Sequence, residues 1–549
     1  MRVLIFENVF SNIAMDNKTK WQPFIYGLLI AAGITIGIWL KPATGNRTLM
    51  FGGNNKFTEV FNLIQQAYVD TVNLDSLEEE TLNALLNKLD PHSVYIPAKD
   101  LQMANEQLEG NFEGIGVEFS ILNDTIMVVS PIEGGPSKEL GILAGDRIVK
   151  VDTIPVAGVD ITNEQVFKLL RGPKGTKVKI EILRSGNNRR LTYEITRNTI
   201  PIYSVDVSMM IDNKTGYIKI SRFAADTHKE FIAALDKLKK QNMQQLIIDL
   251  RGNPGGYLSA ATAIADELLD DNKLIVYTKG RTQPRSDYNA ERKGLFENGK
   301  LAVLIDEGSA SASEILSGAM QDWDRGVLVG RRSFGKGLVQ EPFELKDGSV
   351  VRLTVSRYYT PSGRCIQKPY HDGYEAYEHE LLDRMENGEL KNQAQVRITD
   401  TTTYFTSGGR KVYAKGGIMP DYFVPLDTSY ISTYLLEAMS QNLLNRFAAN
   451  YLDLHRSELM KYGSAKNFND GFQKNLINEF VLFASQNNLE REEDDIQRSG
   501  KYLTQTIKAL IARGLWRDNG YFTVMNTSDK VLQKAFLEIE KGLPQILKP

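Results

Sequence analysis

The chain has 549 residues, too many for one ordinary domain, and 42% hydrophobic and 24% charged residues, as in a globular protein. A net charge of −3 and the lack of a basic block with interleaved aromatic residues argue against a nucleic-acid partner. Cys365 is the single cysteine, which excludes an internal disulfide and a cysteine-based metal cluster. The five histidines are scattered and form no HExxH-like pair. We therefore expect no metal site and no cofactor.

One segment near the N-terminus is strongly apolar. Phe24 to Leu40 runs for 17 residues without a charge, about 26 Å as a helix and enough to span a bilayer. Trp21 and Trp39 lie near its two ends, as interfacial aromatic residues do. A buried core helix and a cleaved signal peptide are the alternatives, but Lys41-Pro42 follows where a small-residue cleavage site would be needed. We predict an uncleaved membrane anchor and linker over residues 1–53.

Residues 54–110 are predicted to be helical, because apolar residues recur there at helical spacing. These residues are Val60, Leu63, Ile64 and Tyr68, followed by Leu82, Leu85, Leu86 and Leu89. The segment Asp90-Pro91-His92-Ser93 interrupts the pattern as a turn. His92 could act as a catalytic base, although a turn histidine with a structural hydrogen bond is the plainer interpretation.

Residues 111–199 change to the period of β-strands. The segments GIGVEFSI, TIMVVSPI, DRIVKVD, KVKIEILR and RRLTYEITR alternate apolar and polar residues between Gly, Pro and Asp turns. With short helices near Lys138–Leu140 and at Asn163–Leu170, this order resembles a PDZ domain. Such a domain adds a peptide to a sheet edge and holds its terminal carboxylate on backbone amides. The resemblance assigns that role to Gly114, Ile115, Gly116 and Val117.

The rest of the chain divides into an α/β region (200–428) and a helical region (429–549). The runs LIIDL, LIVY, LAVLI and VLVG are short and continuously apolar, as buried strands are, and helical patterns lie between them. The predicted fold class is therefore multidomain α+β: a membrane helix, a helical segment, a PDZ-like domain, an α/β core and a C-terminal helical domain. That last domain could mediate homo-oligomer or adaptor contacts, although a plain structural bundle is the simpler interpretation.

A serine cluster, Ser309-Ala310-Ser311-Ala312-Ser313, lies between the LAVLI strand and a helix. A serine at such a junction is accessible, and the helix N-terminus offers free N–H groups to a developing oxyanion. Capping of the helix is the simpler explanation of these serines. Capping needs no general base, however, so the chemical hypothesis depends on what could activate a serine.

Lys336 is the candidate base, because no histidine occupies a suitable position. It lies in SFGKGLVQ, where flanking glycines and apolar neighbours could desolvate its amine and lower the lysine pKa. Gln340, four residues on, could orient the amine without adding charge. A carboxylate would instead keep the lysine protonated, and SFGKGLVQ contains none. A surface lysine in a turn remains the alternative.

A glycine loop, DLRGNPGG, follows the LIIDL strand. It matches neither GxGxxG nor GxxxxGKS/T, which argues against a nucleotide site. Its glycine amides could instead form half of an oxyanion hole, or the loop could be a tight turn without a function.

Together, DLRGNPGG, GSASASEILSGAMQD and SFGKGLVQ, downstream of the PDZ pattern, resemble the carboxyl-terminal processing (tail-specific) serine peptidases. The resemblance covers roughly residues 54–425 and includes LDPHSVY, YYTPSGRCIQ and KGGIMPD. It implies that Ser311 is the nucleophile, Lys336 the general base and Gln340 its support. It also implies an oxyanion hole formed by the Ala312 amide with Gly255 or Gly256.

The same resemblance implies substrates and a location. Members of the family cut proteins with apolar, unstructured C-terminal tails, usually on the outer side of the cytoplasmic membrane. We therefore expect an inner-membrane-anchored endopeptidase whose catalytic part lies in the periplasm or another extracytoplasmic space. The alternative is a catalytically inactive PDZ adaptor or holdase, but such a protein would normally lack the nucleophile or the base, and both are present.

Overall fold

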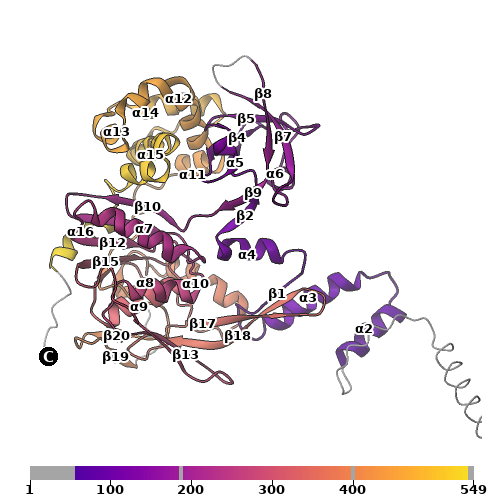
Figure 1. Ribbon diagram of the computed structural model, residues 1–549, viewed down its shortest axis with the longest axis vertical. Helices are drawn as coiled ribbons and strands as arrows, with labels where there is room; N and C mark the ends of the chain where they lie inside the picture. Colours follow the sequence, from indigo (N-terminus) through magenta and orange to yellow (C-terminus); the bar gives the residue numbers. More distant parts are fainter. Residues whose placement is uncertain (1–55, 185–188, 397–401, 542–549) are drawn as a thin grey trace, which may run out of the picture. The chain divides into compact units, whose positions relative to one another are not determined.

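The computed structural model describes residues 56–184, 189–396 and 402–541 of a multidomain α+β protein (Figure 1). Two compact units divide the chain, one ending at Leu77 and the other beginning at Glu78. The predicted anchor Phe24–Leu40 lies outside the described residues and stays a prediction. Within the described ranges, no helix is long and apolar enough to cross a membrane.

The segment predicted to be helical is interrupted by a strand. Helices α2 (Lys56–Ala67), α3 (Leu74–Leu86) and α4 (Leu101–Glu109) form as expected, but β1 (Val94–Ile96) lies between the last two. β1 pairs antiparallel with β18 (Val350–Tyr359), more than 250 residues later in the chain. The helical prediction for 54–110, with its turn at Asp90–Ser93, is therefore wrong at β1, because a distant strand supplies the hydrogen bonds of β1.

The PDZ-like region is a twisted antiparallel sheet with two helices. Its elements are β3 (Val117–Ile121), β4 (Ile126–Pro131), α5 (Pro136–Glu139), β5 (Arg147–Val151), β6 (Ile154–Pro155), α6 (Asn163–Leu170), β7 (Lys177–Leu183) and β8 (Leu191–Thr196). Strands β2 (Asn111–Gly114) and β9 (Asn198–Pro201) pair with each other where the chain enters and leaves this region. Alternate residues of β7, such as Val178 and Ile180, are buried, as the period-2 pattern predicts.

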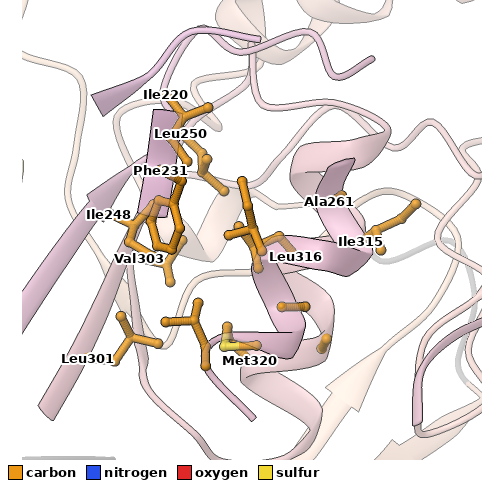
Figure 2. Packing of buried hydrophobic residues seen from close by; sticks show 14 of the residues in the cluster. Ile220, Phe231, Ile248, Leu250, Ala261, Leu301, Val303, Ile315, Leu316 and Met320 are labelled. Carbon is orange, nitrogen blue, oxygen red and sulfur yellow. The ribbon is translucent and has the colours of Figure 1, made fainter. Parts of the chain in front are cut away.

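A six-stranded sheet forms the centre of the α/β region. In spatial order its strands are β10 (Val205–Met210), β11 (Thr215–Ile220), β12 (Gln245–Asp249), β15 (Lys300–Ile305), β16 (Val327–Gly330) and β21 (Tyr422–Phe423). Only β10 pairs antiparallel with its neighbour. Helices α7 (Thr227–Lys239), α8 (Leu258–Asp266) and α9 (Ala312–Asp322) cover one face, where Ile248, Leu250 and Val303 pack against Leu316 and Met320 (Figure 2).

The opposite face of this sheet is covered by the last helix of the chain. Ile247, Ala302 and Leu304 point to that face and pack with residues of α16 (Lys530–Lys541). The buried residues of α16 are Val531, Leu532, Ala535, Glu538 and Ile539. Because central parallel strands need cover on both faces, α16 completes the α/β core although the predicted helical region contains it.

A second, antiparallel sheet carries β18 at its centre. It contains β13 (Leu274–Gly280), β14 (Ser286–Asn289) and β17 (Leu338–Glu344) beside β18 and β1. The run LIVY, predicted as a buried strand, therefore belongs to this sheet and not to the parallel one. The remaining elements of the region are α10 (Tyr374–Glu386), η1 (Gln393–Gln395), β19 (Thr403–Phe405) and β20 (Lys411–Tyr413).

The helical region packs its own core and contacts the PDZ-like region. Its other elements are α11 (Thr433–Ser440), α12 (Leu443–Leu459), η2 (Met460–Tyr462), α13 (Ala465–Gly471), α14 (Leu476–Gln486) and α15 (Glu493–Met525). α15 is kinked at Trp516 and Arg517, which have non-helical backbone angles. Before the kink, Arg513 forms an ion pair with Glu118 of β3 at 2.7 Å.

Helix α16 offers a direct test of this architecture. Leu532→Ala should lower the free energy of unfolding by about 2–4 kcal/mol, since the removed atoms leave a cavity against the central sheet. Leu532 is 3% exposed, whereas Leu537 in the same helix is 59% exposed, so Leu537→Ala should change stability by less than about 0.5 kcal/mol. Chemical denaturation of both variants measures the difference. Equal stabilities would contradict the packing of α16 on the sheet.

Candidate active site

The three motif segments follow three neighbouring parallel strands. DLRGNPGG follows β12, the serine turn follows β15, and the loop with Lys336 follows β16. β12 pairs with β15 and β15 with β16, so their carboxyl ends lie side by side. Ligands of open α/β sheets bind at this edge. The topology therefore brings together segments that span almost 90 residues of sequence.

Of the three serines in the turn, Ser311 differs from the other two. The Ser309 hydroxyl donates to the carbonyl of Leu250 at 2.9 Å, and the Ser313 hydroxyl donates to that of Asn253 at 3.0 Å. Both serines are fully buried, whereas Ser311 is only partly buried. Ser309 and Ser313 thus hold the serine turn on the glycine loop, and Ser311 is the serine open to a substrate.

Ser311 has an unusual backbone conformation, with φ 55° and ψ −112°. Residues other than glycine seldom adopt a positive φ, and this costs on the order of 1–3 kcal/mol. Sharp strand-to-helix turns of this kind present a side chain at the top of a sheet. The strain is therefore consistent with a turn shaped to expose this residue.

Glu314 ties the serine turn to the lysine loop. Its carboxylate is fully buried and accepts hydrogen bonds from the backbone N–H groups of Ser311 (2.9 Å), Gly335 (2.7 Å) and Lys336 (2.8 Å). The Ser333 hydroxyl donates to the same carboxylate. Burial raises the pKa of Glu314 to about 7, and these four donors oppose that rise.

Tyr358 makes a second link between the same two segments. Its buried hydroxyl faces the carbonyl oxygen of Ser311, at 3.1 Å, and that of Lys336. Burial also raises the pKa of this phenol, so it stays a donor across the physiological range. Glu314 thus joins the N–H groups of Ser311 and Lys336, and Tyr358 joins their carbonyl groups.

Lys336 occupies the environment that a lysine base requires. Burial lowers its pKa, and the carboxylates of Glu314 and Asp90 oppose the shift. Its ammonium group has no hydrogen bond or ion pair within the part of the chain that the structure describes. SFGKGLVQ contains no carboxylate, but two carboxylates distant in sequence, Glu314 and Asp90, act on the lysine in the folded chain. Burial nevertheless outweighs them.

Gln340 lies on β17 and contacts Thr354 of β18. Its Nε2 donates to Thr354 Oγ1 at 3.1 Å. The predicted support of Lys336 by Gln340 stays a prediction.

The glycine loop approaches the serine turn without an intervening side chain. A methyl group on Gly255, which has φ +101°, would lie 2.7 Å from Ser311 Cβ and 3.0 Å from the Ala312 nitrogen. The Gly255 N–H donates to Asn253 Oδ1 at 2.9 Å. The N–H groups of Gly256 and Ala312, in contrast, have no partner among the described residues. Of the two glycines left open by the sequence, Gly256 is the one with an available donor.

His92 is a poor candidate for the base. Burial lowers its pKa to about 3, with Lys336 as the next cause. Its Nε2 is also hydrogen-bonded to the Tyr377 hydroxyl at 2.9 Å. A base of such low proton affinity would hold a serine proton weakly at neutral pH.

The predicted carboxylate-binding segment of the PDZ-like region leads into β3. Gly116 has φ +75°, and the Ile115 carbonyl accepts from the Ser137 N–H and hydroxyl, which fixes the segment. Gly114 forms a β-bridge with Arg171, whose guanidinium lies over the Phe112 and Phe167 rings and pairs with Glu106 at 2.6 Å. Phe167 of α6 contacts Phe119 of β3, so the facing surfaces of these two elements are apolar at this point.

Comparison with known proteins assigns the family. A model described as "Peptidase family S41" matches residues 214–373, and one described as "PDZ domain" matches residues 114–195. A carboxy-terminal-processing protease of Bartonella bacilliformis is 32% identical over 388 residues, which is 68% of this chain and 88% of the relative. The carboxy-terminal processing protease CtpA of Bacillus subtilis is 34% identical over 62% of this chain and 73% of its own length.

The chain belongs to the carboxy-terminal processing proteases. It is a peptide-bond hydrolase with a PDZ domain. A solved photosystem II D1 C-terminal processing protease is 29% identical, with a TM-score of 0.33, over 57% of this chain and 89% of that chain. A family of unknown function matches residues 434–518 of the helical region.

The residues that join the two loops of this protease have roles that its sequence motifs do not reveal. Glu314 is visible as the fourth residue of a capping-box pattern that begins at Ser311. That pattern predicts the bond to the Ser311 N–H, but the bonds to Gly335 and Lys336 depend on the tertiary fold. Tyr358 begins the YYTPSGRCIQ motif, but nothing in that motif predicts its contacts with the Ser311 and Lys336 carbonyl groups, and Thr354 is an ordinary strand residue.

The close approach of the glycine loop yields a second test. Gly255→Ala should lower protease activity by about 100-fold, because the new methyl group would displace the Ser311 turn by a fraction of an ångström or more. Gly252 in the same loop also has a positive φ, but a methyl group there meets nothing within 4 Å. Gly252→Ala is thus the matched control for backbone strain. If both variants lose activity equally, displacement of Ser311 is not the cause.

Proposed function

We propose that this protease is a serine endopeptidase with a Ser311–Lys336 dyad. The neutral Lys336 amine takes the proton of Ser311 Oγ as the oxygen attacks the scissile carbonyl carbon. When the tetrahedral intermediate collapses, the C–N bond breaks and the ammonium returns its proton to the leaving amine. Water then hydrolyses the acyl-enzyme with the same base. Gln340 is proposed to support the lysine.

The proposed oxyanion hole consists of the Gly256 and Ala312 N–H groups. Ala312 is the first residue of α9, so the positive end of the helix dipole adds to its N–H. Gly255 would contribute by its lack of a side chain, and its N–H is engaged with Asn253. Donors of this kind typically contribute about 3–4 kcal/mol to transition-state stabilisation.

One observation carries this proposal above all: a partly exposed, strained Ser311 shares the buried Glu314 carboxylate with a desolvated Lys336. The alternative, an inactive PDZ adaptor or holdase, does not need a serine and a lysine held together in this way. A holdase would also gain nothing from a backbone conformation that costs stability.

We further propose that the substrates are proteins with apolar C-terminal tails and that the PDZ domain binds the tail. The apolar surface formed by the contacting Phe119 and Phe167 rings suits such a side chain, and Gly114–Val117 would hold the terminal carboxylate. The proposed location is the inner membrane, with residues 24–40 as the anchor and the catalytic part on the extracytoplasmic side. A homo-oligomeric or adaptor role of the helical region stays a hypothesis.

The deciding experiment incubates the chain from about residue 45 with an unfolded protein that ends in an apolar tail. Wild type should cleave it, and Ser311→Ala should not, while both bind the tail. Amidation of the substrate terminus should weaken binding, because the amides of the PDZ segment lose a charged acceptor. Ser309→Ala and Ser313→Ala remove the bonds that hold the serine turn but keep Ser311, so each should retain part of the cleavage that Ser311→Ala loses. Full cleavage by Ser311→Ala would refute the assigned nucleophile.

The pH dependence of cleavage tests the base. Because burial lowers the pKa of Lys336, kcat/KM should rise with pH and level off well below the free-lysine value of about 10.4. Lys336→Arg should be inactive, since a guanidinium does not deprotonate in this range. Gln340→Glu should move the rising limb to higher pH, because a carboxylate favours the ammonium. Robust turnover by Lys336→Arg would show that another base serves Ser311.

A further inference from the structure

A partly buried chain of hydrogen bonds leads from Gln340 to the turn at Asp90. Gln340 Nε2 donates to Thr354 Oγ1 at 3.1 Å, and Thr354 Oγ1 donates to Asp90 Oδ1 at 3.0 Å. Gln340 and Thr354 face each other across β17 and β18, at a β-bulge. Asp90 belongs to the LDPHSVY segment, which the proposed chemistry has not used so far.

Asp90 is held in one orientation. It is 7% exposed, and its Oδ1 accepts from the N–H groups of His92 (2.8 Å) and Ser93 (2.9 Å) while its Oδ2 accepts from the Ser93 hydroxyl (2.6 Å). Ser93 Oγ in turn accepts from the Thr354 N–H at 3.1 Å. The turn and the strand β18 are therefore fixed to each other at two points.

These bonds determine which end of the Gln340 amide faces Thr354. The Asp90 oxygens act as acceptors in each of these bonds, so the Thr354 hydroxyl donates its single proton to Asp90. The Thr354 oxygen is left as an acceptor, and the NH₂ end of Gln340 must donate to it. The carbonyl oxygen of Gln340 is consequently the end of the amide that has no partner among the described residues. Without this chain, the two ends of an amide are nearly interchangeable.

We propose that Asp90 and Thr354 are positioning residues that act through Gln340 to present its carbonyl oxygen to Lys336. This inference rests on the proposed role of Lys336 as the base. A carbonyl oxygen can accept a hydrogen bond from the lysine in both its amine and its ammonium form. An NH₂ group of the glutamine would instead place its own protons against those of the lysine. Asp90 is thus assigned a catalytic support role although it lies nearly 250 residues before Lys336.

Several charged groups around Lys336 act on its protonation besides Gln340. Glu314 and Asp90 favour the charged amine, and Arg352 opposes it. Arg352 itself donates to Asn105 Oδ1 at 2.6 Å. His92 is neutral near pH 7, and Lys368, the other cation that acts on it, pairs with Glu380 at 3.2 Å. Asp90 therefore contributes a charge as well as an orientation.

The test compares Thr354→Val with Thr354→Ser in the full chain. Valine has nearly the shape of threonine but breaks both bonds of the chain, whereas serine keeps the hydroxyl. Thr354→Val should lower the maximal kcat about tenfold and move the rising limb of the pH profile to lower pH by about half a unit or more, because Gln340 would no longer be held to offer its carbonyl oxygen when Lys336 takes up the proton. Thr354→Ser, which keeps the hydroxyl, should have a maximal kcat within about threefold of wild type. Its rising limb should lie within a few tenths of a pH unit of the wild-type limb.

A double variant separates positioning from a merely structural effect. If Thr354 acts through Gln340, then Thr354→Val should cause no further loss in a Gln340→Ala background. An equal loss in both backgrounds, or an unshifted pH profile, would overturn the inference. Lys336→Ala serves as the separate control: if that variant stays active, the proposed dyad itself fails. An inactive Lys336→Ala with an unaffected Thr354→Val would overturn only the present inference.

Discussion

The buried carboxylate of Glu314 is the interaction on which the site depends. Ser311 and Lys336 lie on loops that follow different strands, and neither loop is part of a helix or sheet at that point. One side chain satisfies three backbone N–H groups from both loops, which would otherwise be buried donors without partners. Burying a carboxylate costs free energy, and the pKa of about 7 records that cost. A neutral side chain at this position would avoid that cost, but it would offer fewer acceptor positions for the four donors.

The parallel sheet explains why these loops meet at all. β12, β15 and β16 are adjacent and parallel, so the segments after them emerge at one edge. Such strands need cover on both faces, and α16 provides it on the side opposite α9. Asp529 caps α16 and also pairs with Arg251 of the glycine loop at 2.6 Å. The last helix of the chain therefore both completes the core and holds the loop proposed to carry the oxyanion hole.

Local pattern was sufficient for much of the fold. The strand segments of the PDZ domain and the helix at Asn163–Leu170 follow from alternation and capping residues that the sequence displays. β1 could not be predicted, because its three residues become a strand only through pairing with β18. The same holds for the site: the serine turn and the SFGKGLVQ loop carry recognisable motifs, but Glu314 reaches the lysine loop only in the folded chain. Long-range hydrogen bonds leave no local signal in the sequence.

A lysine base must be neutral, yet two carboxylates act on Lys336. If burial were the only requirement, an apolar pocket would suffice, and Glu314 and Asp90 would be disadvantages. Each of them, however, has its oxygen atoms occupied by N–H or O–H donors, which spread its charge and reduce its pull on the ammonium. The carboxylates thus fix the backbone and the Gln340 amide, while burial still lowers the lysine pKa. The two carboxylates therefore hold the groups around the proposed dyad in place, although their negative charge moderately favours the protonated lysine.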